Sequence, residues 1–206
     1  MAVKRFVPLV LCVALLASGC GGGELSLTEF VERLNPIMVR ASQQYEELVT
    51  SPKGAVLVAE GAQLADFTPQ DLQAALERLG EIEAEALEAG AAIEPPAQVA
   101  DLANLLSDDR FTSARVALAA RAGSATNWEE LSETPEMAAY RTALAVDKQT
   151  CIDLQAKLDA TAERGVFADA PWIPGELKEI VEGFLGCDGL PENPDDVYRP
   201  PPTSTP

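Results

Sequence analysis

The stretch LSLTEFVERLNPIMVRASQQYEEL, residues 25–48, gives the clearest folding signal in the chain. Ser26 and Glu29 have the spacing of a capping box, and Leu25 and Phe30 have that of a hydrophobic staple, so a helix is expected to begin here. Pro36 is expected to kink it. Apolar residues then recur at helical spacing with charges on the opposite face; they are Phe30, Leu34, Ile37, Met38, Ala41, Tyr45 and Leu48.

Three further stretches show the same periodicity, and each is expected to form a long helix. The first follows Thr68 and Pro69, a good helix start, and its core face is Leu72, Leu76, Leu79, Ile82, Ala86 and Leu87. The second has Val99, Leu102, Leu106, Val116 and the alanines up to Ala122, with residues 107–109 as an interruption. The third has Met137, Tyr140, Leu144, Cys151, Leu154, Leu158 and Ala162.

Shorter segments connect these helices. Residues 55–66 are expected to form a short helix, with a strand as the alternative for residues 55–58, and a capping pattern precedes a connector helix at Trp128. A final helix is expected around residues 177–184. Residues 190–206 are rich in Pro and Asp and lack apolar periodicity, so they are expected to be a disordered tail.

Amphipathic helices joined by short turns must bury their apolar faces against each other. The predicted fold is therefore all-α: an antiparallel helical bundle of four main helices plus short connector helices. The bundle domain is expected to span residues 25–189, ahead of the disordered C-terminal tail at residues 190–206.

The N-terminus is typical of an export signal. Lys4 and Arg5 precede an apolar run over residues 6–17, which is too short to cross a bilayer as a helix. The run ends in Leu16-Ala17-Ser18-Gly19-Cys20, which resembles the lipobox of bacterial lipoproteins. The resemblance implies that residues 1–19 are a signal peptide and that Cys20 is lipidated, with palmitate-type chains, at the head of a glycine tether over residues 20–24. A plain secretory signal and a short uncleaved anchor are the alternatives.

Such a protein would be extracytoplasmic and held by its lipid on the outer face of the plasma membrane, or on the outer membrane of a cell with two membranes. The leader holds two of the 15 basic residues and none of the 33 acidic ones, which leaves 13 basic against 33 acidic residues, a net charge of −20. This charge disfavours nucleic acid as a partner. It favours a solvated acidic surface or, alternatively, a face that docks a cationic or envelope protein partner.

The residue types present restrict the chemistry. The chain has no histidine, which removes Ser–His and Cys–His catalysis and the commonest metal ligand, so no catalytic residue, metal or cofactor is expected. Cys151 and Cys187 are expected to form a structural disulfide, because an exported protein permits one and no C-x-x-C motif suggests redox activity. Glu81, Glu83 and Glu85 should spread around their helix.

The candidates for ligand contact are aromatic residues and one methionine. Trp128 and Trp172 fall in connectors, where an aromatic side chain either closes the end of a bundle or stacks on a ligand. Tyr45, Tyr140 and Met38 are the candidates for lining a pocket between helices.

Over its whole length the chain resembles acidic, all-helical bacterial lipoproteins without an established activity. The resemblance depends on Ser26-Leu27-Thr28-Glu29-Phe30, on Ile93-Glu94-Pro95-Pro96-Ala97-Gln98-Val99 and on the two late cysteines. It implies the fold and the location only. The function expected is that of a lipid-anchored, non-enzymatic binding or scaffolding module of the cell envelope. One alternative is a small-ligand carrier; the other is a carboxylate-dependent hydrolase, for which the sequence selects no pair of facing acids.

Overall fold

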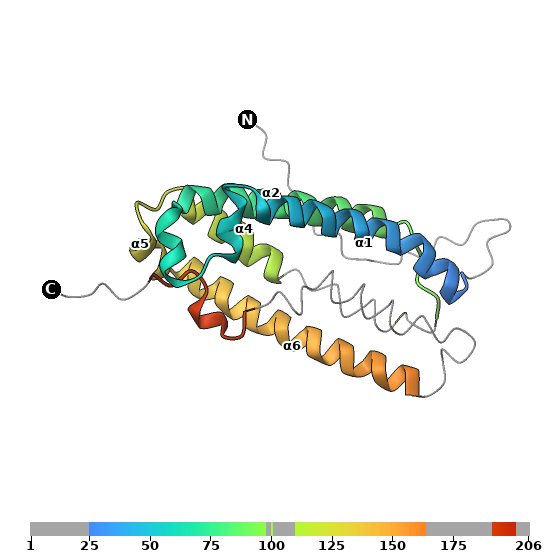
Figure 1. Ribbon diagram of the computed structural model, residues 1–206. Helices are drawn as coiled ribbons and strands as arrows, with labels where there is room; N and C mark the ends of the chain where they lie inside the picture. The colour runs from blue at the N-terminus through green and yellow to red at the C-terminus, as the bar shows by residue number, and fades with distance from the viewer. Residues whose placement is uncertain (1–24, 98–99, 101–109, 164–190, 201–206) are drawn as a thin grey trace.

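The computed structural model describes residues 25–97, 100, 110–163 and 191–200, and the regular secondary structure in this part of the chain is all helical, with no strand. The long helices are α1 (Leu27–Thr50), α2 (Pro69–Gly90), α4 (Arg110–Ala122) and α6 (Pro135–Glu163). They pack as a bundle in the order α1, α2, α4, α6 (Figure 1). The predicted antiparallel all-α bundle is confirmed.

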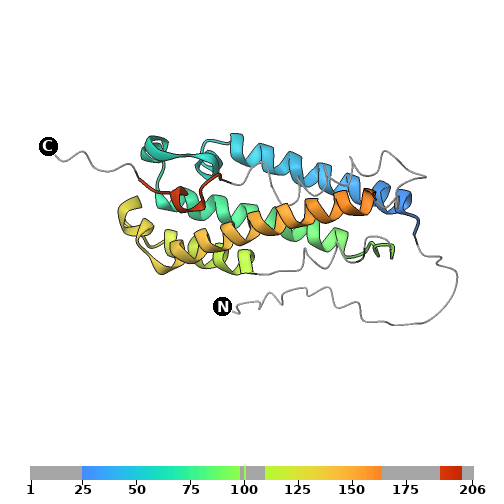
Figure 2. The ribbon, with the colours of Figure 1, turned by 90° about the horizontal axis from the view of Figure 1, so that it is seen from below.

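Short elements lie between the long helices and along α6. They are the 3₁₀ helices η1 (Gly54–Val58) and η2 (Gly61–Asp66), the helix α5 (Trp128–Ser132) and the 3₁₀ helix η4 (Pro194–Asp196). Residues 55–66 are thus helical, as predicted, and the alternative of a strand at residues 55–58 is wrong. These short helices and α5 gather at one end of the bundle, opposite the start of α1 (Figures 1 and 2).

The helix starts are confirmed in detail. The Ser26 hydroxyl accepts from the Glu29 N–H at 3.2 Å, and the Ser26 N–H donates to the Glu29 carboxylate at 3.0 Å. Thr68 and Asp71 repeat this reciprocal pair at 3.2 and 3.0 Å. In each pair, two backbone N–H groups at the start of the helix donate to side-chain oxygen atoms, and without these acceptors they would lack a partner within the helix.

The core lies between α2, α4 and α6 and is closed by η1, η2 and α5. Its fully buried members include Val56, Leu64, Leu72, Leu76, Leu118, Leu131 and Met137. Three large side chains that were predicted to lie on the apolar faces are exposed instead: Tyr45, Leu87 and Val116 are 39%, 48% and 60% exposed. The buried face of α4 instead carries Arg115 and Leu118, because α4 turns a charged residue toward α2.

The prediction of a disordered tail is wrong for residues 191–200. This segment, called the C-terminal strap below, runs along α6 and contains η4. Tyr198 is buried in the core, and Val197 is partly buried against it. The prediction failed because it required a periodic apolar pattern, whereas two anchoring side chains together with hydrogen bonds from α6 hold the strap.

Several predictions concern residues outside the described ones. They are the signal peptide and the lipidated Cys20, the tether up to residue 24, the interruption at residues 107–109, the final helix with Trp172, Cys187, and residues 201–206 of the tail. Among the helices that the structure describes, none is both long enough and apolar enough to cross a bilayer.

Candidate functional site

Aromatic rings from four separate segments meet near the end of the bundle where α5 lies. The Tyr198 ring of the strap stacks against Trp128 of α5 and Tyr140 of α6, with centroids 6.0 and 6.3 Å apart. Phe111 of α4 contacts Tyr140 from the other side, with centroids 5.5 Å apart. The Trp128 indole N–H donates to the Phe67 carbonyl at 2.8 Å, which ties this cluster to the segment before α2.

The strap is held on α6 by two basic side chains. Arg141 donates from Nε and Nη2 to the Val197 carbonyl at 3.0 and 2.8 Å. Its Nη1 reaches the Ser132 carbonyl at 3.3 Å. Lys148 donates from Nζ to the carbonyls of residues 191 and 192 at 3.2 and 2.9 Å. All of these acceptors are main-chain oxygen atoms.

An ion pair between a buried arginine and a partly exposed glutamate lies beside the aromatic cluster and joins α2 to α4. The Arg115 guanidinium contacts the Glu83 carboxylate at 2.8 Å and the Leu76 carbonyl at 2.9 Å. Arg115 is 4% exposed, and its Nε is buried without a hydrogen-bond partner. Gly80 provides the space, because a Cβ at this position would overlap with the guanidinium.

The environment shifts the proton affinities of this region. Burial is the largest cause raising the pKa of Glu83, while the Arg115 charge lowers it and Asp147 raises it. Burial also raises the pKa of Tyr140 and of Tyr198, and the nearby Glu83 charge adds to the shift at Tyr140. The pKa of Tyr198 is raised further by Tyr140, including a hydrogen bond with its side chain. Both phenols therefore stay neutral and serve as packing and hydrogen-bonding groups.

As predicted, the acidic residues of α2 spread around the helix and do not converge on one site. Glu81 pairs with Arg78 at 2.8 Å on the surface, Glu83 pairs with Arg115, and Glu85 accepts from Gln44 at 3.3 Å. The described residues contain no group of three or more Cys, Asp or Glu side chains that could hold a metal ion.

A shallow groove runs between α1 and α2, with a volume of about 50 Å³. Ligand pockets for drug-sized molecules have volumes of roughly 300–1,000 Å³, so this groove is far smaller. Its lining residues are Ile37, Arg40, Ala41, Gln44, Glu85, Ala86 and Ala89.

The structure places the predicted site residues in different environments. Trp128 is buried and closes the end of the bundle, which was one of its two predicted roles. Tyr140 and Met38 are buried in the packed interior, while Tyr45 on α1 is 39% exposed. Cys151 is fully buried in α6, as one half of a structural disulfide would be.

Sequence reasoning missed most residues of this region, including the two basic residues that hold the strap. Arg115 and Glu83 were assigned no partner, and Tyr198 was placed in the disordered tail. Gly80 offered a signal for the first two, because a glycine in the middle of a strong helix often marks a close approach. No local signal identified Tyr198, which lies in a segment rich in acidic and proline residues.

Comparisons with known protein families, with curated proteins and with solved structures give no significant match for this chain.

Proposed function

We propose that this protein is a lipid-anchored, extracytoplasmic helical bundle that acts as a binding or scaffolding module of the cell envelope. The observation that carries the proposal is the stretch Leu16-Ala17-Ser18-Gly19-Cys20 after a short apolar run. The chain has no histidine, and the function proposed is binding without chemical turnover. The strongly acidic mature chain would be repelled by an anionic membrane surface, so its lipid is the proposed means of attachment.

The arrangement of the helices indicates which end of the bundle would face away from the membrane. A tether of five residues reaches about 15 Å at most, so the start of α1 would stay close to the membrane. The 24 residues of α1 span about 36 Å. The strap and α5 lie at the opposite end of the bundle from the start of α1, so they would face away from the membrane (Figures 1 and 2).

We also propose that Cys151 and Cys187 form a disulfide that stabilises the domain. Burial of Cys151 supports this proposal, since a buried position protects a structural disulfide from exchange. An exported protein would acquire the bond in an oxidising compartment.

Fatty-acid labelling tests the anchor. The wild type and the variants Cys20→Ser and Cys12→Ser are expressed in cells fed a labelled fatty acid. Label is expected on the wild type and on Cys12→Ser, which changes a cysteine of the leader, and not on Cys20→Ser. Label on Cys20→Ser, or its absence from the wild type, would contradict lipidation at Cys20.

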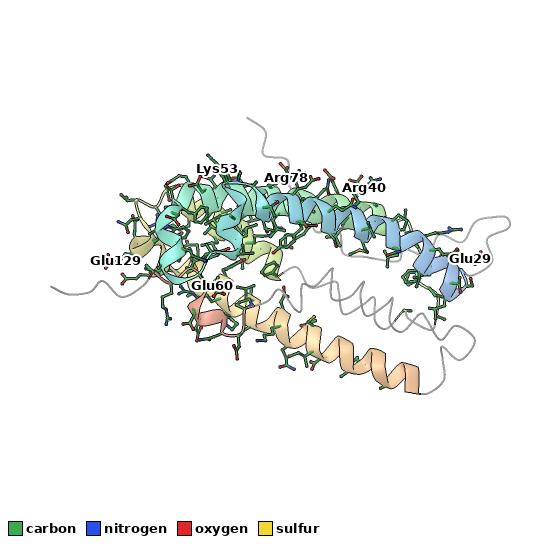
Figure 3. All side chains as sticks on the ribbon, in the orientation of Figure 1. Glu29, Arg40, Lys53, Glu60, Arg78 and Glu129 are labelled. Carbon is green, nitrogen blue, oxygen red and sulfur yellow. The ribbon has the colours of Figure 1, made fainter. Side chains whose placement is uncertain are left out.

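Site-directed crosslinking in intact cells tests the binding role. Glu129 and Glu29 lie at opposite ends of the bundle (Figure 3), so a photo-crosslinker at each samples the two ends separately. We expect position 129 to capture a discrete envelope protein and position 29 to give no such product. Turnover of an envelope polymer by the purified protein would overturn the proposal.

A further inference from the structure

The strap is attached to α6 through features that any peptide shares. The hydrogen bonds that Arg141 and Lys148 donate to the strap go to its main-chain carbonyls, at residues 191, 192 and 197. Every residue of a peptide offers such an acceptor, so these contacts depend on the course of the strap backbone, which turns through η4, and not on the side chains of residues 191, 192 and 197. Arg141 and Lys148 are thus suited to hold another peptide whose backbone follows the same course.

One side chain gives the strap its specificity. Tyr198 is 4% exposed, and its ring is nearly parallel to those of Trp128 and Tyr140, at 25° and 22°. Residues 192, 193, 195 and 196 of the strap are exposed. The strap is therefore recognised through an aromatic slot for one tyrosine and through hydrogen bonds to the main chain beside it.

The tyrosine occupies this slot with a strained backbone. The φ angle of Tyr198 is +51°, in the left-handed region that favours glycine and disfavours a bulky aromatic residue. The surrounding contacts hold the residue there against that preference. Withdrawal of Tyr198 from the slot would relieve this strain.

We infer that Trp128, Tyr140 and Arg141 form a peptide-binding slot that the strap occupies in cis, and that the occupant in trans is a tyrosine-bearing segment of a partner protein that turns as the strap does. The valine before Tyr198 is partly buried, so an apolar residue before the tyrosine fits best. Acidic residues before that position fit as well, because Asp195 and Asp196 lie near enough to act on the Arg141 charge.

This inference rests on the proposed function in one respect, because it gives the binding module its docking site. The slot lies at the end of the bundle opposite the start of α1, where a tethered protein would meet a partner (Figure 1). The test below concerns peptide binding alone and does not involve the lipid, so its failure is distinguishable from failure of the labelling experiment at Cys20.

Peptide titration tests the slot directly. The full-length protein in detergent is prepared as wild type, as Tyr198→Ala and as Arg199→Ala, a control that changes the exposed neighbour and leaves the tyrosine in place. Each is titrated with a synthetic peptide of residues 191–200 and with the same peptide carrying Tyr198→Ala, and tryptophan emission reports binding.

We expect saturable binding of the wild-type peptide to the Tyr198→Ala protein. The wild type and Arg199→Ala should bind it at least about 10-fold more weakly, because their own strap competes at a high local concentration. Equal binding by all three proteins, equal binding of both peptides, or no saturable binding by folded Tyr198→Ala would each overturn the inference.

Hydrogen exchange on the wild type keeps the inference testable if Tyr198→Ala does not fold. The N–H groups of Asp196, Val197 and Arg199 donate within the strap, so their protection reports its opening. They are expected to exchange at least about 100-fold faster than the amide of the buried Leu144 in α6, because the strap opens without global unfolding. Equal protection of the strap and of α6 would overturn the inference.

Discussion

Replacement of Gly80 by alanine tests the packing of α2 against α4. A Cβ at position 80 would overlap with Nη1 of Arg115 and lie 3.1 Å from its Cζ. The guanidinium can move aside only if it gives up its contacts with the Leu76 carbonyl at 2.9 Å and the Glu83 carboxylate at 2.8 Å. In contrast, a Cβ at Gly90 would meet only Leu34, at 4.0 Å.

Two opposing contributions set the size of the change in the free energy of unfolding. Alanine is favoured over glycine inside a helix by about 1 kcal/mol. Breaking the contacts of a buried guanidinium costs about 3–5 kcal/mol when its charge loses its partner. The net loss expected for Gly80→Ala is therefore about 3 kcal/mol, which corresponds to a fall in Tm of about 6–12 °C for a chain of this size.

Urea unfolding and thermal melts followed by circular dichroism measure this loss for the wild type, Gly80→Ala and Gly90→Ala. Gly90→Ala is expected to be as stable as the wild type or slightly more so. The penalty of Gly80→Ala should shrink in an Arg115→Met background, where the group that is displaced has been removed. A Gly80→Ala protein as stable as the wild type would refute the placement of the guanidinium against Gly80.

Three further outcomes are expected. Burial raises the pKa of Glu83 above 4.5, so the folded state binds the proton of this carboxyl more tightly than the unfolded state. The free energy of unfolding of the wild type relative to Glu83→Gln should therefore fall as the pH rises from 4.5 through the raised pKa. Urea unfolding across this pH range measures the difference, and an increase with pH would contradict the prediction. Trp128→Phe loses the hydrogen bond to the Phe67 carbonyl and should lower the free energy of unfolding by about 1 kcal/mol, measured by urea unfolding followed by circular dichroism; an unchanged value would show that the bond contributes nothing. Cys187→Ser should lower the Tm by about 8–16 °C, since a loop of about 36 residues closed by a disulfide is worth about 4 kcal/mol; an unchanged thermal melt under oxidising conditions would argue against the bond.

Local signals account for what the sequence predicted correctly. The starts of α1 and α2 were predictable because a capping box depends on two residues three positions apart, Ser26 with Glu29 and Thr68 with Asp71. The order of the long helices followed from apolar periodicity, which is also local. Short connections between the helices then restricted the fold to an antiparallel bundle.

The candidate site could not be predicted because its contacts join distant parts of the chain. The buried face of α4 depends on a partner in α2, so periodicity alone put Val116 inside and left Arg115 outside. Tyr198 is separated from Trp128 and Tyr140 by more of the chain still, and only the folded bundle forms the slot that receives it. Polar neighbours and proline, used to predict disorder, do not prevent a single aromatic side chain from anchoring a segment.

The stacked rings also give the protein a built-in optical reporter. Light absorbed by the phenols of Tyr140 and Tyr198 is passed efficiently to a nearby indole, and the Trp128 ring lies 6.0 Å from the ring of Tyr198. The native emission spectrum should therefore show little tyrosine fluorescence on excitation of both residue types. Recovery of that fluorescence would record departure of the Tyr198 side chain in unlabelled protein, in real time.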